Sequence, residues 1–193
     1  MSLLEKFFKL DLCMENINIA WKSKDGEPHY ESTPVGAYIF ASTGCDGASF
    51  CIIPRHGDET FENSPVFNLS PMDFSSGTVV WASKNFEDFL RLTVLFKTAW
   101  GAGLYDIYNI SETEFEEAIK DRNEEIKTWN KSKQKQLKEI INSIQSILPK
   151  TKVRYDYDYF INSYRNTDNH IDLEFKSDVK MHIYKLGCYC HDD

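Results

Sequence analysis

The sequence of 193 residues lacks a long hydrophobic run. No segment holds about 18 uninterrupted apolar residues, the length that a membrane-spanning helix needs. Glu5, Lys6 and Lys9 interrupt the apolar opening of the chain, so no secretory signal peptide is predicted either. We therefore expect a soluble chain that neither crosses nor binds a membrane.

Basic residues are also scarce. The chain has 22 Lys and Arg against 30 Asp and Glu, which gives a formal net charge of -8. Because so acidic a chain repels a phosphate backbone, nucleic acid is not an expected partner.

Cysteine is limited to five scattered residues, and an odd, scattered set does not resemble a secreted disulfide framework. A cytoplasmic location is therefore expected. Cys188, Cys190 and His191 bring three potential metal ligands together near the C-terminus. Structural zinc usually needs a second pair of ligands, so no metal is predicted, although a metal bound by these three residues stays open.

Sequence motifs of catalysis are missing as well. The chain has no Gly-x-Ser-x-Gly elbow, no phosphate-binding loop and no His-Glu-x-x-His pattern. These absences favour a binding protein without a cofactor over an enzyme. An enzyme with a scattered site remains the alternative, with His56, Tyr155, Asp156 and Asp158 as the first suspects.

The first half of the chain has the pattern of strands and turns. Apolar runs at residues 35–41 and 49–53 flank Asp46-Gly47, a pair that suits a tight turn, so residues 35–54 are predicted as a β-hairpin. Further strands are predicted at residues 16–21, 65–69 and 78–82.

Two helical segments follow these strands. Asn85 is a candidate N-cap with acidic residues just after it, and Ser111 with Glu114 forms a capping-box pattern. Apolar residues then recur at helical spacing until Pro149, which predicts a long helix over about residues 111–148 or two helices with a break near Asn130.

Residues 151–193 return to strand periodicity. Alternating patterns predict strands at residues 153–159, 171–176 and 181–184. The expected fold class is therefore α+β, a mostly antiparallel sheet backed by helices with a β-rich C-terminal extension. We predict one domain over residues 1–193, with a core over about residues 1–148 and the extension at 149–193.

The acidic excess is concentrated near the N-terminus. Residues 1–82 carry 5 basic and 11 acidic side chains, whereas residues 111–150 carry 8 of each. The excess either serves solubility or forms an acidic face for a basic partner.

Residues 35–95 carry a family resemblance. Ser42-Thr43-Gly44-Cys45-Asp46-Gly47 lies between two strands, Gly57-Asp58 follows in a charged loop, and Asn85-Phe86-Glu87-Asp88-Phe89-Leu90 opens a helix. This order resembles the SUKH superfamily, also called the Smi/Knr family. Residues 1–34 lack the opening pattern of that family, and the segments after residue 95 lie outside its core.

The resemblance implies a binding role. Bacterial members of the family look like immunity proteins that block a toxin, often a nuclease, by occlusion, and fungal members look like regulators of cell-wall synthesis and signalling. Expected partners are therefore a basic toxin domain or, for a regulatory scaffold, another protein; the oligomeric state stays open. The candidate partner-binding residues lie on turns between the early strands: Asp46, Asp58, Glu59, Phe61, Glu62, Asp73 and Phe74.

Overall fold

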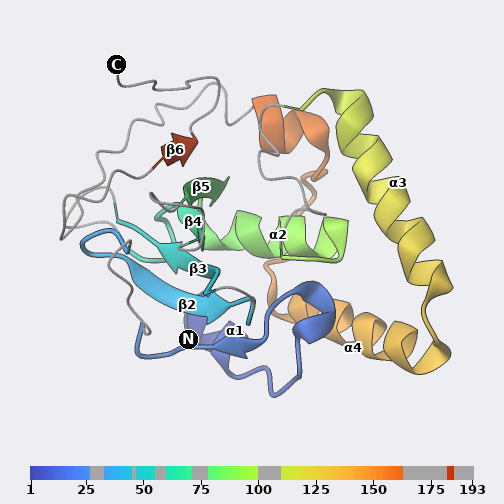
Figure 1. Cartoon of the computed structure of the whole chain (residues 1–193), viewed down its shortest axis with the longest axis horizontal. Coiled ribbons are helices and arrows are strands. Elements are labelled where there is room, and N and C mark those ends of the chain that lie inside the picture. Colours follow the sequence, from blue (N-terminus) through green and yellow to red (C-terminus); the bar gives the residue numbers. More distant parts are fainter. Residues whose placement is uncertain are drawn as a thin grey trace.

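The computed structural model describes residues 1–26, 33–44, 47–54, 60–70, 78–99, 110–162 and 182–184. The fold is α+β, as predicted. A six-stranded sheet lies beside a group of helices, with the strands on the left and helices α2, α3 and α4 on the right of the view in Figure 1. Among the described residues no helix combines the length and the apolar character needed to cross a membrane.

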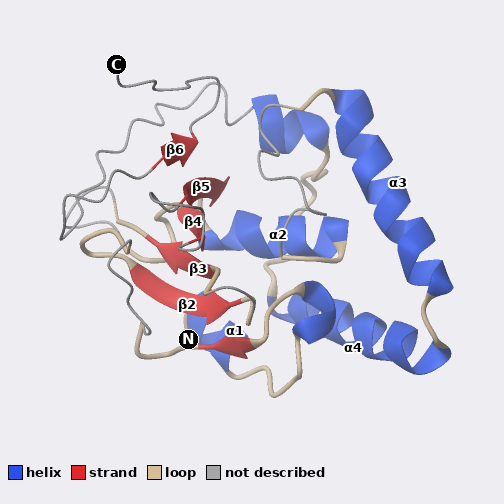
Figure 2. Ribbon diagram, viewed as in Figure 1, coloured by secondary structure: helices blue, strands red, loops and turns tan. Residues whose placement is uncertain are grey.

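The sheet follows the order of the chain. Its strands are β1 (Trp21–Lys22), β2 (Tyr38–Ser42), β3 (Ser49–Ile52), β4 (Val66–Ser70), β5 (Thr78–Ser83) and β6 (His182–Tyr184). Neighbours from β1 to β5 pair antiparallel, and β6 pairs parallel to β5. The structure confirms the predicted hairpin and the strands expected near residues 65–69, 78–82 and 181–184. Figure 2 shows the strands as red arrows.

Both faces of the middle of the sheet are buried. Successive side chains of a strand point to opposite faces. Phe50 and Ile52 belong to a core cluster shared with Phe86 and Phe89, while Cys51 belongs to a second cluster. Two-sided burial explains why β3 reads in the sequence as a continuous apolar run rather than an alternating one.

The described helices are α1 (Leu3–Phe8), η1 (Glu15–Ile17), α2 (Phe86–Phe96), α3 (Glu112–Thr128), α4 (Lys131–Ile147) and the π-helix η4 (Asp158–Asn162). Capping side chains mark the starts of α1, α2, α3 and α4, whereas η1 has no side-chain cap. Asn85 Oδ1 accepts a hydrogen bond from the backbone N–H of Asp88 at 2.8 Å. Ser111 and Glu114 form the predicted capping box. Both caps satisfy backbone donors that a helix start leaves unpaired.

Residues 111–148 form two helices, the second of the two predicted alternatives, and not one long helix. Trp129 and Asn130 have extended backbone with ψ of 153° and 159°. Asn130 Oδ1 then accepts from the Lys133 N–H at 2.9 Å and starts α4 as its N-cap. Figure 1 shows that α3 and α4 run in different directions from this corner. The break is the one that the sequence left open near Asn130.

Two predicted strands are wrong. Residues 15–17 form the 3₁₀-helix η1, and Asn18 follows with φ of 59°. Of the strand expected at residues 16–21, Trp21 alone lies in a strand, as the first residue of the two-residue β1. The segment expected as a strand at residues 153–159 leads into η4 instead, with Asp156 Oδ1 accepting from the Tyr159 N–H at 3.2 Å. The strand predicted at residues 171–176 lies outside the described residues.

Candidate protein-binding site

Phe61 is the predicted site residue that stands out on the surface. It is 43% exposed, although most large apolar residues of the described chain are buried. It lies in the turn that precedes β4, where Thr60 O accepts from the N–H groups of Asn63 and Ser64 at 3.0 Å and 3.1 Å. Ser64 Oγ donates to the same oxygen at 2.9 Å. The turn therefore holds Phe61 in one place without burying it.

The ring of Phe61 rests on Tyr38, the first residue of β2. Their ring centroids are 4.9 Å apart and their planes differ by 29°, a stacked arrangement. The Tyr38 hydroxyl donates to Lys24 O at 2.7 Å, and this hydrogen bond fixes the position of the tyrosine ring under Phe61. Burial and the charge of Asp25 raise the pKa of Tyr38, so its hydroxyl stays protonated at neutral pH. The stack joins a rigid strand to an exposed turn.

Gly26 allows the chain to pass close to Tyr38. Its φ of +77° lies in the left-handed region, and a Cβ built on it would stand 3.0 Å from Tyr38 Cδ2. A larger residue here would both strain the backbone and push the tyrosine ring. The small residue therefore helps to set the position of the Tyr38–Phe61 stack.

Glu62 has a structural task beside Phe61. Its Oε1 accepts from the N–H of Leu4 at 2.8 Å, and its carbonyl oxygen accepts from the N–H of Phe86 at 3.2 Å. The same residue thus ties the turn to the starts of both α1 and α2. A carboxylate at a helix start is also favoured by the helix dipole. Glu62 anchors the turn, and Phe61 is the part of it that faces outward.

A hollow of about 550 Å³ lies between α1 and the start of β2. It is open to solvent, and Tyr38 is part of its wall, so the hollow and the Phe61 stack share a residue. Three charged side chains belong to its lining. The lining residues are Met1, Leu4, Glu5, Phe8, Lys9, Lys24 and Tyr38. An aromatic stack beside such a hollow can receive a protruding side chain from another protein.

The structure brings only part of the predicted site together. Phe61 and Glu62 are adjacent in the turn before β4, whereas the other five predicted residues lie outside the described residues: Asp46, Asp58, Glu59, Asp73 and Phe74. Tyr38 was missed. It sits inside an apolar run, which indicates a buried strand and gives no sign that one ring is a platform for an exposed neighbour.

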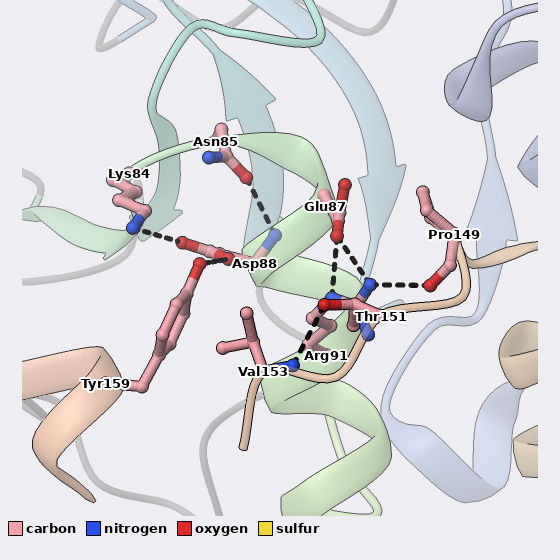
Figure 3. A network of polar contacts seen from close by, with 9 residues as sticks. All are labelled: Lys84, Asn85, Glu87, Asp88, Arg91, Pro149, Thr151, Val153 and Tyr159. Carbon is pink, nitrogen blue, oxygen red and sulfur yellow. Dashed lines mark hydrogen bonds and ion pairs between the residues drawn. The ribbon is translucent and has the colours of Figure 1, made fainter. Parts of the chain in front are cut away.

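A second polar cluster joins α2 to the chain that follows α4 (Figure 3). Asp88 is only 3% exposed, and its carboxylate accepts from the Tyr159 hydroxyl at 3.0 Å and contacts Lys84 Nζ at 3.3 Å. Burial raises the pKa of Asp88, while Lys84 and Tyr159 oppose that rise. Burial of the Tyr159 hydroxyl, followed by the charge of Asp88, raises the pKa of Tyr159. The buried carboxylate of Asp88 therefore has both a hydrogen-bond donor and a cationic partner within the cluster.

Arg91 extends this cluster along α2. Its guanidinium donates to Glu87 Oε1 at 2.7 Å and to Pro149 O at 2.9 Å, and it lies 3.9 Å from the ring centroid of Tyr155. Thr151 Oγ1 accepts from the Val153 N–H at 3.0 Å within the segment of residues 149–159, called the strap below. A smaller hollow of about 410 Å³ lies beside Arg91 and Tyr155. The contacts fasten residues 149–159 to α2.

Of the residues suspected of catalysis, Tyr155 takes part in this attachment through its contact with Arg91. Asp156 bonds within its own segment, to the Tyr159 N–H and, at 3.0 Å, to Arg154. Asp158 begins η4, and His56 lies outside the described residues. The three that are described therefore do not gather around a shared open site.

Within the described segments, no group of three or more His, Cys, Asp or Glu side chains could hold a metal ion, and Cys188, Cys190 and His191 fall outside those segments. Cys51 is fully buried, and its burial raises the pKa of the thiol. A buried thiol with a raised pKa is a poor nucleophile.

Comparisons with known proteins give no relative from which the role of the site could be inferred. No protein-family model matches the chain, and neither the curated proteins nor the solved structures gave a significant match.

Proposed function

We propose that the chain is a non-catalytic cytoplasmic binding protein, an immunity protein of the kind that the SUKH resemblance implies. Its task would be to neutralise a basic toxin domain, such as a nuclease, by covering that domain's surface. The observation that carries the proposal is Phe61, an exposed aromatic side chain held rigidly on Tyr38 within an acidic stretch of sequence.

The rigidity of Phe61 matters for affinity. Binding energy at protein interfaces concentrates in a few residues, and aromatic side chains are frequent among them. An anchor that is already ordered loses less conformational entropy when the partner arrives. The hydrogen bonds within the turn and the Tyr38 stack provide that order in the free protein.

The charge around the anchor supports a basic partner. Asp58, Glu59 and Glu62 lie within five residues that also include Phe61, and residues 1–82 carry most of the acidic excess of the chain. Complementary charge steers two proteins toward each other and raises the association rate, an effect that salt screens. Binding should therefore weaken as the salt concentration rises.

The second polar cluster supports the same choice over an enzyme. Catalytic groups need access to a substrate and a geometry that gathers them. Tyr155 and Asp88 instead hold residues 149–159 against α2, and Asp156 bonds within that segment.

The test pairs the full chain with toxin domains encoded by neighbouring genes. Isothermal titration calorimetry at two salt concentrations should give binding that weakens with salt. Phe61→Ala should weaken binding at least tenfold, the scale of an interface hot spot. Reversing the charges at Asp58 and Glu59 should mainly slow association.

Val35→Ala is a matched control, because Val35 is 40% exposed and lies in a different loop. Binding that fails with every neighbouring toxin domain would refute the proposal. Binding that is insensitive both to Phe61→Ala and to the charge reversals would also refute it.

A further inference from the structure

The hollow of about 410 Å³ beside Arg91 has apolar walls from three segments of the chain. Val94 and Leu95 come from α2, Leu148 directly follows α4, and Val153 belongs to the strap. Val153 is 50% exposed, so its side chain is accessible to a ligand. The volume lies within the range of about 300–1,000 Å³ that is common for small-molecule pockets. This space, called the Arg91 hollow below, can take the apolar part of a small molecule.

The charged groups of the Arg91 hollow are basic. Arg91 and Lys150 belong to its lining, whereas no described Asp or Glu does. Glu87 pairs with Arg91 at 2.5 Å but is not part of the lining. The hollow therefore favours an anion, although the chain as a whole carries a net charge of -8.

The guanidinium of Arg91 has donors to spare. Of its three nitrogens, Nε donates to Glu87 Oε1 at 2.7 Å, and Nη2 donates to Pro149 O at 2.9 Å (Figure 3). The two N–H groups of Nη1 have no acceptor among the described residues.

Nη1 of Arg91 is also accessible to solvent. The described nitrogen and oxygen atoms that are buried without a partner include Arg122 Nε but no atom of Arg91. Only 10% of the Arg91 side chain is exposed, and Arg91 lines the hollow. We therefore place the accessible Nη1 at the wall of the hollow.

The position of the guanidinium is fixed before any ligand arrives. Glu87 and Pro149 bind one part of it, and the ring centroid of Tyr155 lies 3.9 Å from Arg91 Cζ. A donor that is already ordered loses little conformational entropy on binding. The Tyr155 hydroxyl has no partner among the described residues and is not a buried atom, so it offers a second donor in the same lining.

From these features we infer that the Arg91 hollow binds a small monocarboxylate with an apolar chain. The carboxylate accepts hydrogen bonds from Arg91 Nη1 and from the Tyr155 hydroxyl, and Lys150 adds positive charge. The apolar chain packs against Val94 and Val153. A hydrogen bond between an ionised donor and a carboxylate is about twice as strong as a neutral one, so the negative charge decides which apolar ligand is preferred. The site does not depend on the proposed function.

The test compares three ligands that share one apolar chain: octanoate, 1-octanol and octylammonium. Each is titrated into the full ¹⁵N-labelled chain, and the assigned amide signals are followed by NMR. Octanoate should bind with a Kd of roughly 1 mM and shift signals of residues 91–95 and 148–155. Octanol should bind at least about tenfold more weakly, because it lacks the charge that Arg91 recognises. Octylammonium should also bind more weakly, although the net charge of the chain favours a cation.

Two variants locate the ligand. Val153→Glu places a negative charge in the lining at an exposed position and should weaken octanoate binding at least about tenfold. Val35→Glu is its matched control, because Val35 is 40% exposed and does not line the hollow, and it should leave the Kd unchanged.

Arg91→Lys tests the guanidinium itself. A single ammonium that serves Glu87 and Pro149 leaves no donor for the ligand, so octanoate should bind about tenfold more weakly, with the fold checked by circular dichroism. If this variant does not fold, Val153→Glu decides alone.

Octanoate that does not saturate the chain, octanol or octylammonium that binds equally well, or signal shifts centred on other residues would overturn the inference. An equal loss with Val35→Glu and Val153→Glu would overturn it too. Toxin binding that fails while octanoate binds as expected would refute the proposed function and sustain the carboxylate site.

Discussion

The hydrogen bond between Tyr159 and Asp88 gives the sharpest test of how the strap at residues 149–159 is held. Tyr159→Phe removes one hydroxyl and keeps the ring. The ring contacts with Tyr155 at 4.6 Å and Phe160 at 5.0 Å, and the Lys84 ammonium 4.5 Å from the ring centroid, do not depend on the hydroxyl. The variant therefore removes the 3.0 Å bond to Asp88 Oδ1 and keeps these ring contacts.

The size of the effect follows from the burial of the acceptor. Asp88 is 3% exposed, so water does not readily replace the lost donor. A hydrogen bond to a charged group contributes about 1.5–3 kcal/mol, and we expect a loss of about 2 kcal/mol in unfolding free energy. In a domain of this length such a loss corresponds to a fall in Tm of about 4–8 °C.

Tyr157→Phe is the matched control. The Tyr157 hydroxyl donates to Ile110 O at 3.2 Å, a neutral acceptor. A neutral hydrogen bond contributes about 0.5–1.5 kcal/mol, so this variant should lose less stability than Tyr159→Phe. Urea denaturation of both variants, followed by circular dichroism, measures the difference.

The pH dependence adds a second readout. Burial raises the pKa of Asp88 above its ordinary value of 3.8, so the stability linked to its neutral form is present below that value and is lost as the pH rises through the folded-state pKa. The Tyr159 bond opposes this rise by favouring the charged form. Tyr159→Phe should therefore cost more at pH 7 than at pH 4. A loss below about 0.5 kcal/mol, or an equal loss at both pH values, would refute the reasoning.

Three further predictions concern other parts of the fold. Ile144→Ala should cost about 2–5 kcal/mol in urea denaturation, because Ile144 is fully buried where α4 meets the core. Asn130→Ala should cost about 1 kcal/mol by the same assay, because it removes the N-cap of α4. In a thiol-labelling experiment on the native chain, exposed Cys13 should react much faster than Cys51, which is buried with a raised pKa; equal rates would contradict the burial of β3.

The sequence predicts those elements whose local signals agree with their tertiary surroundings. The hairpin, β4, β5 and α2 follow from apolar runs bounded by turn residues and from the Asn85 cap, and the structure has all of them. The start of α3 follows from the Ser111–Glu114 capping box, a local interaction within four residues. Such elements need no knowledge of distant contacts.

The wrong predictions arise where distant partners decide. The alternation of tyrosine and aspartate after residue 153 has the period of a strand, yet Tyr155 and Tyr159 contact α2, and Tyr157 donates to the Ile110 carbonyl before α3. Those bonds require a chain that turns through η4 rather than one that continues extended. Periodicity reports which residues are apolar or aromatic and not where their partners lie.

The candidate site was predictable in part for the same reason. Phe61 is identifiable as an aromatic residue within an acidic turn, a local feature of sequence. Its platform, Tyr38, lies 23 positions earlier, and the link of Glu62 to Leu4 spans 58 positions. Contacts at such separations depend on the assembled sheet and helices. The sequence therefore predicts Phe61 as a site residue but not the contacts that hold it in place.

The most direct test of the central claim is the affinity of the full chain for a neighbouring toxin domain, measured by calorimetry for the wild type and for Phe61→Ala. We predict binding that weakens with salt and a loss of at least tenfold in the variant, with its fold intact by circular dichroism. Equal affinities for the wild type and Phe61→Ala would contradict the claim that Phe61 is the anchor of the partner-binding surface.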